Sequence, residues 1–312
     1  MAAMGLITFL LASCGNGTGS ETTDRPRAAA GPAENVRVTL AGRKGPESAG
    51  LVMAAKWGYF EDENLDVAVL APGSPQSPID YVVDKIDEIG VSHQPEVMLA
   101  QRKGAPIAIV GSLIPRPTAA MIWLEKSKIR RIADLRGKTI AIPGLPFQKI
   151  FLERILERAG LSLGDVRVRD VQYDLVASLV SGRADAIFGG SANIEGIELE
   201  SAGLNPVITP VSSLGVPFYE ELVLIARTDY VKRKPQVIRG FMKAVRRGTA
   251  EAIEDPETAA WVIDSESETV LGTDRKEMEA EVEATLPLLS RSGSPSFGQA
   301  GRLASWMRSA AP

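Results

Sequence analysis

A short polar turn, Ser92-His93-Gln94, follows the apolar run of residues 86–91 and precedes Pro95. Because proline and an acid such as Glu96 are favourable in the first turn of a helix, the sequence predicts a strand, a turn and a helix in succession. Ligands of open α/β sheets bind at the carboxyl ends of the strands. A neutral imidazole can donate and accept hydrogen bonds, so Ser92, His93 and Gln94 are candidate solute ligands. A structural role at the helix start is the alternative for His93.

A second candidate turn, residues 41–45, is basic and begins and ends with small residues. It follows residues 36–40, whose alternating apolar and polar side chains predict a strand. Arg43 or Lys44 could pair with a carboxylate, sulfonate or phosphate group of a solute. The alternative is a solvated surface turn, because surface basic residues are common.

Three more segments combine turn residues with polar or aromatic side chains. Backbone N–H groups at a helix start can bind an acceptor group, and glycine lets a ligand approach the backbone closely. An aromatic ring there could stack on a solute or belong to the core, and neighbouring glutamates could accept from an amine or form a solvated pair. The candidate residues of these segments are Gly144, Phe147, Gly190, Ser191, Asn193, Tyr219, Glu220 and Glu221.

Composition excludes several classes of protein. At 312 residues with 45% hydrophobic content, the chain is long enough for two domains, and a net charge of -4 argues against a nucleic-acid partner. The single cysteine and single histidine argue against a disulfide framework, a Cys/His zinc site and any Ser-His-Asp mechanism not built on His93. We therefore expect no metal and no cofactor.

The amino terminus resembles a bacterial lipoprotein signal. Residues 1–14 form an apolar run too short to span a bilayer, and Leu11-Ala12-Ser13-Cys14 matches the motif whose cysteine is lipidated, although the usual preceding basic residues are missing. Residues 15–35 are polar and small, which is typical of a disordered tether. We expect an extracytoplasmic protein that is lipid-anchored to the cell membrane through Cys14. The alternative is a buried core cysteine.

Strand and helix patterns alternate along the rest of the chain and predict an α/β protein of two lobes, each a mixed sheet flanked by helices. Two crossings, at residues 112–118 and 221–226, would give a first lobe of residues 36–118 and 222–312 and a second of residues 119–221. Such lobes can close around a small ligand by hinge bending. A single doubly wound sheet is the alternative. The four tryptophans lie in apolar contexts and are expected in the core.

Several short motifs, taken in order, resemble those of the solute-binding components of ABC importers. They are Gly58-Tyr59-Phe60, Gly90-Val91-Ser92, Gln94-Pro95-Glu96-Val97, Pro143-Gly144 and Glu221-Leu222-Val223-Leu224. The pattern, over residues 36–290, is most similar to the group of thiamine-pyrimidine-precursor binders and the fungal pyrimidine synthase. Nitrate, taurine and sulfonate binders are wider relatives. This resemblance implies the type II periplasmic-binding-protein fold, a small solute, a membrane permease as partner and a monomer.

The chain also departs from that family. The pyrimidine binders usually carry a Trp and an Asn/His-containing turn after the first strand, where this sequence has Arg43 and Lys44. A sulfonate, taurine or nitrate anion, or a riboflavin-like heterocycle, therefore remains an alternative solute. The synthase uses its own His, a Lys-bound pyridoxal phosphate and a cysteine-rich loop, and this chain has no such loop, so we expect no enzyme. A sensor that has lost its solute is the third possibility.

Overall fold

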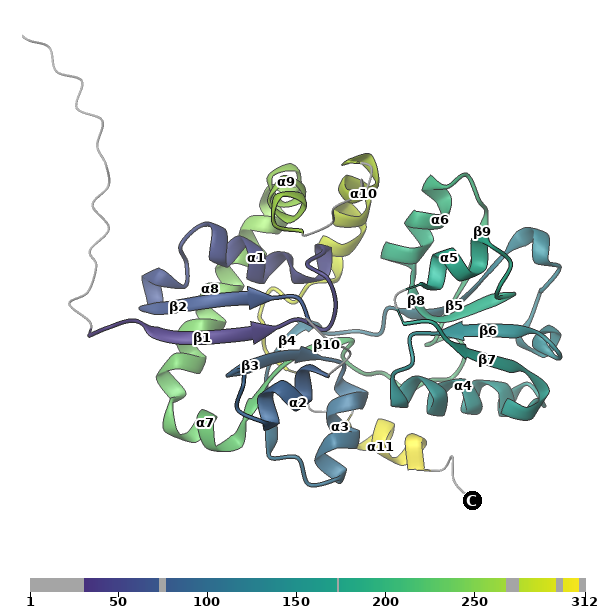
Figure 1. Cartoon of the computed structure of the whole chain (residues 1–312), viewed down its shortest axis with the longest axis horizontal. Helices are drawn as coiled ribbons and strands as arrows, with labels where there is room; N and C mark the ends of the chain where they lie inside the picture. Colours follow the sequence, from purple (N-terminus) through teal and green to yellow (C-terminus); the bar gives the residue numbers. More distant parts are fainter. Residues whose placement is uncertain (1–30, 73–76, 173, 268–274, 296–299, 309–312) are drawn as a thin grey trace, which may run out of the picture. The chain divides into compact units, whose positions relative to one another are not determined.

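The computed structural model describes residues 31–72, 77–172, 174–267, 275–295 and 300–308. The predicted signal segment, Cys14 and the tether up to residue 30 lie outside the described residues. Within the described part, the strands form two separate five-stranded sheets (Figure 1). The two-lobed α/β fold is therefore confirmed, and a single continuous sheet is wrong.

The first sheet has the strand order β2-β1-β3-β10-β4. Strand β1 is parallel to β2 and β3, and β10 is antiparallel to β3 and β4. Strand β10 follows all five strands of the second sheet in the sequence, so the chain returns to the first sheet to complete it. The strands are β1 (Glu34–Thr39), β2 (Leu65–Leu70), β3 (Ile89–Ser92), β4 (Ile107–Ile114) and β10 (Leu222–Arg227).

The second sheet repeats this topology with the order β7-β6-β8-β5-β9. Strand β6 is parallel to β7 and β8, while β5 is antiparallel to β8 and β9. In each sheet the antiparallel strand is the one by which the chain enters from the other sheet. The strands are β5 (Ala119–Leu124), β6 (Thr139–Ile142), β7 (Arg167–Asp170), β8 (Ala186–Ser191) and β9 (Pro206–Pro210).

Helices cover both faces of the first sheet (Figure 1). Alternate residues of β10 show this, since Leu224 belongs to one core cluster while Val223 and Ile225 belong to the other. Helices α1 (Ala49–Lys56), α8 (Pro235–Glu254), α9 (Pro256–Glu266) and α10 (Arg275–Thr285) contribute to the first cluster. Helices α2 (Pro78–Val83) and α3 (Gln94–Arg102) lie over the opposite face, and α7 (Thr228–Arg233) follows β10.

The second sheet is covered in the same way. Helix α4 (Pro146–Arg158) packs on one face, and α5 (Leu175–Val180) and α6 (Ile197–Ser201) on the other. A five-residue π-helical stretch, Ala192–Gly196, joins β8 to α6. The carboxyl-terminal helix α11 (Ala300–Arg308), which the sequence assigned with residues 222–312 to the first lobe, contributes Leu303 and Met307 to the core beside α4.

Some local predictions were wrong. The strand expected from residue 86 begins at Ile89, and Ile86 is 45% exposed because the chain turns before entering the sheet. Trp57 and Trp261 were expected in the core but are 41% and 52% exposed. Trp57 ends α1, and the Trp261 ring is covered on one side by the Lys56 ammonium group rather than by another layer of structure.

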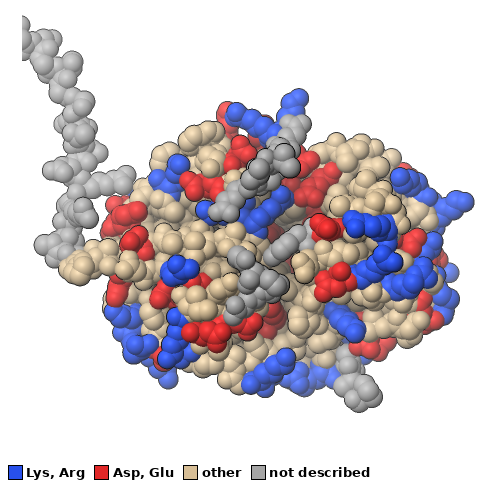
Figure 2. All heavy atoms as spheres, viewed as in Figure 1, with Lys and Arg blue, Asp and Glu red and all other residues tan. Residues whose placement is uncertain are grey.

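Figure 2 shows Lys and Arg side chains interspersed with Asp and Glu among the described residues of the face that it draws. In the described part of the chain, no helix combines the length and the apolar character needed to cross a bilayer.

Because α1 packs closely against α8, we expect a substitution at one glycine of α8 to destabilise the fold. A Cβ atom at Gly248 would overlap the carbonyl oxygen of Gly50 and lie 2.7 Å from the backbone nitrogen of Ala54. We expect Gly248→Ala to lower the free energy of unfolding by about 2 kcal/mol or more, because backbone atoms must move apart. Urea unfolding followed by circular dichroism measures this change.

Gly301 of α11 is the matched control, because nothing lies within 4 Å of a Cβ atom built there. Gly301→Ala should be neutral or stabilise by up to about 1 kcal/mol through helix propensity. Equal effects of the two substitutions would contradict the close helix contact.

Candidate functional site

A cavity of about 760 Å³ lies at the carboxyl ends of strands from both sheets. The first sheet supplies the segments that follow β1, β2 and β3, and the second supplies those that follow β6, β7 and β8. This is the position expected for a ligand site in α/β sheets. Representative lining residues from the six segments are Arg43, Ala71, His93, Gly144, Asp170 and Ser191.

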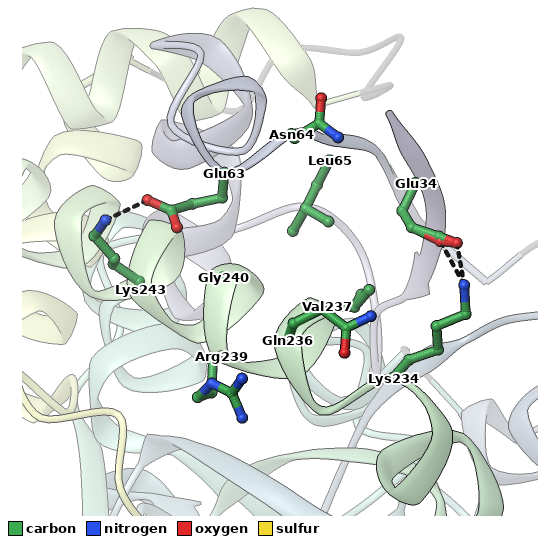
Figure 3. A pocket seen from close by; sticks show the side chains of 10 residues that line it. All are labelled: Glu34, Glu63, Asn64, Leu65, Lys234, Gln236, Val237, Arg239, Gly240 and Lys243. Atoms are coloured by element: carbon green, nitrogen blue, oxygen red, sulfur yellow. Dashed lines mark hydrogen bonds and ion pairs between the residues drawn. The ribbon is translucent and has the colours of Figure 1, made fainter. Parts of the chain in front are cut away.

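A second hollow, of about 550 Å³, lies between the start of β2 and α8 (Figure 3). Four of its charged groups form ion pairs, since Lys243 Nζ lies 2.6 Å from Glu63 Oε1 and Lys234 Nζ lies 3.1 Å from Glu34 Oε2. None of the residues proposed from the sequence lines this hollow. We therefore take the cavity between the sheets as the candidate site.

Glu221 forms part of the cavity wall where the two chain crossings meet. Its Oε2 accepts hydrogen bonds from the backbone N–H groups of Thr118 (2.8 Å) and Ala119 (3.1 Å) and from the Tyr219 hydroxyl (3.0 Å). Burial and the neighbouring Glu221 charge raise the pKa of Tyr219 well above its usual value, so the phenol stays a donor. Through these hydrogen bonds, Glu221 links the start of β5 to the start of β10.

His93 lines the cavity, and the ring of Phe147 packs against its imidazole. Its ring lies 5.3 Å from the ring of Phe147, which in turn packs edge-on against Phe151. His93 Nε2 lies 3.8 Å from Glu221 Oε1, and the buried Nδ1 has no hydrogen-bond partner among the described residues. Phe147 is buried and does not line the cavity, so it positions the imidazole.

The two basic side chains of the turn after β1 have different surroundings. Arg43 lines the cavity and its Nη2 lies 3.0 Å from Glu198 Oε1 of α6. Lys44 is absent from the described cavity lining, and its Nζ lies 3.7 Å from Glu266 Oε2 of α9. The turn therefore presents one positive charge to the cavity, and that charge already has a carboxylate partner.

Other residues proposed from the sequence lie behind the described lining and hold the turns in place. The Ser92 hydroxyl donates to Glu96 (2.8 Å), and Gln94 Oε1 accepts from the Glu220 backbone (2.9 Å). Asn193 Nδ2 donates to Thr285 Oγ1 of α10 (2.9 Å). The residues that do not line the cavity are Lys44, Ser92, Gln94, Phe147, Gly190, Asn193, Tyr219 and Glu220, and those that do are Arg43, His93, Gly144, Ser191 and Glu221.

Gly144 illustrates how tightly the wall is built. Its φ of 89° is in the left-handed region, and a Cβ atom there would overlap the carboxylate of Asp170. Only glycine meets both requirements without strain. Opposite it, the Ser191 backbone N–H donates to Glu195 Oε2 at 2.7 Å.

Four acidic residues of the site were missed by sequence reasoning. Together with Glu221 they make five carboxylates in the described lining, against one arginine. Each lies at a strand's carboxyl end or in the helical turns that follow it, which is the signal that could have identified them. The four are Glu47, Asp170, Glu195 and Glu198.

Burial raises the pKa of several of these carboxyl groups. Desolvation, followed by the charges of Glu195 and Glu221, raises the pKa of Glu47 to about 8. Desolvation also raises the pKa of Glu195 and of Glu198. At neutral pH, the Glu47 carboxyl can therefore donate a hydrogen bond as well as accept one. Among the described residues, no group of three or more His, Cys, Asp or Glu side chains could hold a metal ion.

Comparison with known proteins places this site in context. The chain matches the family model described as NMT1/THI5 like over residues 45–259. A formylaminopyrimidine-binding protein of Halalkalibacterium halodurans is 34% identical over 263 residues, which are 83% of this chain and 76% of that protein. The 4-amino-5-hydroxymethyl-2-methylpyrimidine phosphate synthase of Candida albicans is 27% identical, covering 65% of this chain and 62% of that protein.

The fold is also found among solved structures. The periplasmic aliphatic sulphonate binding protein SsuA from Escherichia coli has a TM-score of 0.69 and 18% identity to this chain. The match covers 89% of this chain and 85% of SsuA. At this identity the similarity establishes the shared architecture.

Glu281 of α10, next to the cavity, predicts a pH dependence of stability. Its carboxyl group is fully buried, and desolvation raises its pKa from 4.5 to about 8, with Arg43 opposing and Glu198, Glu277 and Glu195 adding to the shift. Between these values the folded chain keeps a proton that the unfolded chain releases, so stability falls as pH rises from about 5 to about 8. Glu281→Gln should remove this part of the fall and be more stable than wild type at pH 9.

Denaturant unfolding from pH 5 to pH 9 tests this prediction. Glu283→Gln is the matched control, because Glu283 is an exposed residue of the same helix. Its profile should run parallel to that of wild type. If the Glu281→Gln profile did the same, the buried carboxyl would not be the source of the pH dependence.

Proposed function

Because the chain belongs to the NMT1/THI5-like family, as the sequence motifs predicted, we propose that it is the solute-binding component of an ABC importer for an amino-substituted pyrimidine, a thiamine precursor. The relative from Halalkalibacterium halodurans is named for binding formylaminopyrimidine. The two lobes would close over the solute and deliver it to a membrane permease. No bond is made or broken in this function.

The acidic cavity is the observation that carries the choice of solute. An aminopyrimidine offers exocyclic N–H donors and ring-nitrogen acceptors. The Glu195 carboxyl group can accept from the amine, and the protonated Glu47 carboxyl can donate to a ring nitrogen. A hydrogen bond is electrostatically stronger in a desolvated cleft than in water. The cavity therefore matches a solute rich in donors.

The size and shape of the cavity agree with this proposal. A volume of about 760 Å³ lies within the range of small-molecule sites. His93 is the only aromatic residue in the described lining, and Phe147 supports its ring. A flat heterocycle could stack on this imidazole, which would replace the tryptophan that pyrimidine binders usually carry after the first strand.

Anionic solutes fit this cavity less well. A nitrate or sulfonate would be placed among acidic side chains, and those that are ionised would repel it in a desolvated cleft. Arg43, the cation proposed from the sequence to bind an anion, is paired with Glu198. Charge complementarity thus favours the pyrimidine over a sulfonate, taurine or nitrate.

The cavity also favours a binding protein over a synthase. The described lining contains no lysine that could hold pyridoxal phosphate, and Lys44 is directed to Glu266. The single cysteine of the chain is Cys14, far in sequence from every lining segment. The chemical groups that the related synthase requires are therefore not gathered at this site.

Isothermal titration calorimetry tests the proposed solute. We expect formylaminopyrimidine to bind, and methanesulfonate, taurine and nitrate to bind at least a hundred-fold more weakly. Glu195→Gln should weaken pyrimidine binding about ten-fold or more, because an acceptor oxygen is replaced by an amide donor. Riboflavin is included because a larger heterocycle is the remaining alternative.

Glu200→Gln is the matched control, since Glu200 is an exposed residue of α6. Its affinity should equal that of wild type. Tight binding of an anion together with no pyrimidine binding would overturn the proposal, as would turnover of the pyrimidine by the purified chain.

Membrane anchoring through Cys14 completes the proposed function and rests on the motif Leu11-Ala12-Ser13-Cys14. In bacterial cells that produce the full chain, wild type should incorporate labelled palmitate and sediment with membranes. Cys14→Ser should abolish the labelling and leave the protein in the soluble fraction, because the acceptor thiol is lost. Unchanged labelling of the variant would disprove lipidation at this residue.

A further inference from the structure

Arg43 joins elements that belong to opposite lobes. It lies in the turn after β1, in the first lobe, and its Nη2 is 3.0 Å from Glu198 Oε1 of α6, which packs on the second sheet. The same nitrogen lies 3.8 Å from Glu281 Oε1 of α10. A single guanidinium thus lies between a carboxyl group of its own lobe and one of the facing lobe.

The two carboxylates differ in their surroundings. Glu281 is fully buried, and neither of its oxygens has a hydrogen-bond partner among the described residues. Its α10 neighbours Met278 and Val282 are part of the first lobe's core, so its position is fixed by packing. Glu198 is partly exposed and belongs to the second lobe. The Arg43 guanidinium therefore has a carboxyl group of fixed position beside it within its own lobe.

A second contact crosses between the two lobes. Asn193, in the π-helical stretch before α6, donates to Thr285 of α10 at 2.9 Å, and both side chains are buried. Asn193 does not line the cavity in the described part of the chain. Two polar contacts therefore connect the lobes, Arg43–Glu198 within the described cavity lining and Asn193–Thr285 outside it.

We infer that Arg43 is a latch residue, which stabilises the closed arrangement of the lobes by pairing with Glu198 and is positioned for this by Glu281, rather than a residue that binds solute. The inference depends on the two-lobed fold and not on the identity of the solute. Under this inference, the basic turn after β1 acts in closing the two lobes.

The strength of the latch suits a protein that must open again. The Arg43 side chain is 48% exposed, so solvent screens its pair with Glu198. Such a pair shifts the balance between open and closed forms by a small factor, and solute binding can add the remainder. We expect loss of the latch to weaken solute binding about three- to ten-fold.

A double-mutant cycle separates the latch from direct solute contact. Arg43→Gln, Glu198→Gln and the double variant are compared with wild type, and Arg102→Gln, an exposed arginine at the end of α3, is the control. Spin labels are attached at Glu283→Cys on α10 and Glu200→Cys on α6 in full-length chain carrying Cys14→Ser. Their separation is measured without solute, and the dissociation constant for formylaminopyrimidine is measured on unlabelled protein.

If Arg43 is a latch, the two single variants shift the label distances to longer values by the same amount, and the double variant shifts them no further. The dissociation constants follow the same pattern, while Arg102→Gln behaves as wild type. Unchanged label distances in all variants would overturn the inference. So would an affinity loss confined to Arg43→Gln, because Arg43 would then contact the solute directly.

Failure of the proposed function would look different. If none of the solutes binds, the label distances measured without solute still confirm or overturn the latch. If the pyrimidine binds equally well to every variant and the distances do not change, the proposed function stands and the latch is wrong.

Discussion

The carboxylate of Glu221 determines how the two halves of this protein are joined. It accepts from two successive backbone N–H groups at the entry to β5 and from the Tyr219 hydroxyl just before β10. Buried polar groups need such partners, so the two crossings are held side by side at the point where both sheets end. The cavity exists because the strands' carboxyl ends are brought to this junction, and its wall includes the same carboxylate.

Sequence reasoning located the turns of the site well but not the side chains that face the cavity. Strand ends are predictable because apolar runs stop at polar or glycine-containing turns. Within a turn, however, adjacent residues point in different directions. His93 lines the cavity, while Ser92 and Gln94 bond to Glu96 and Glu220 behind it. These directions depend on tertiary packing, which no local pattern contains.

The charge of the site was harder to predict, because its members come from distant segments. Arg43 suggested an anion when considered with its sequence neighbours alone. Its partner Glu198 is 155 residues away, and Glu47 and Glu195 approach each other only across the cavity. The exposed Trp57 and Trp261 show the same limit, since an apolar context does not reveal whether a further layer covers the helix.

The placement of α11 has a mechanical consequence. Leu303 and Met307 are buried with residues of α4, and Trp306 packs edge-on against Phe151 at 5.2 Å. Helix α11, which follows α10 of the first lobe in the sequence, is thus packed against the second lobe. A wide opening of the lobes that separated α11 from α4 would expose these apolar side chains to water, at a cost that grows with the area uncovered. The packing of α11 would therefore limit such an opening in addition to the two strand connections.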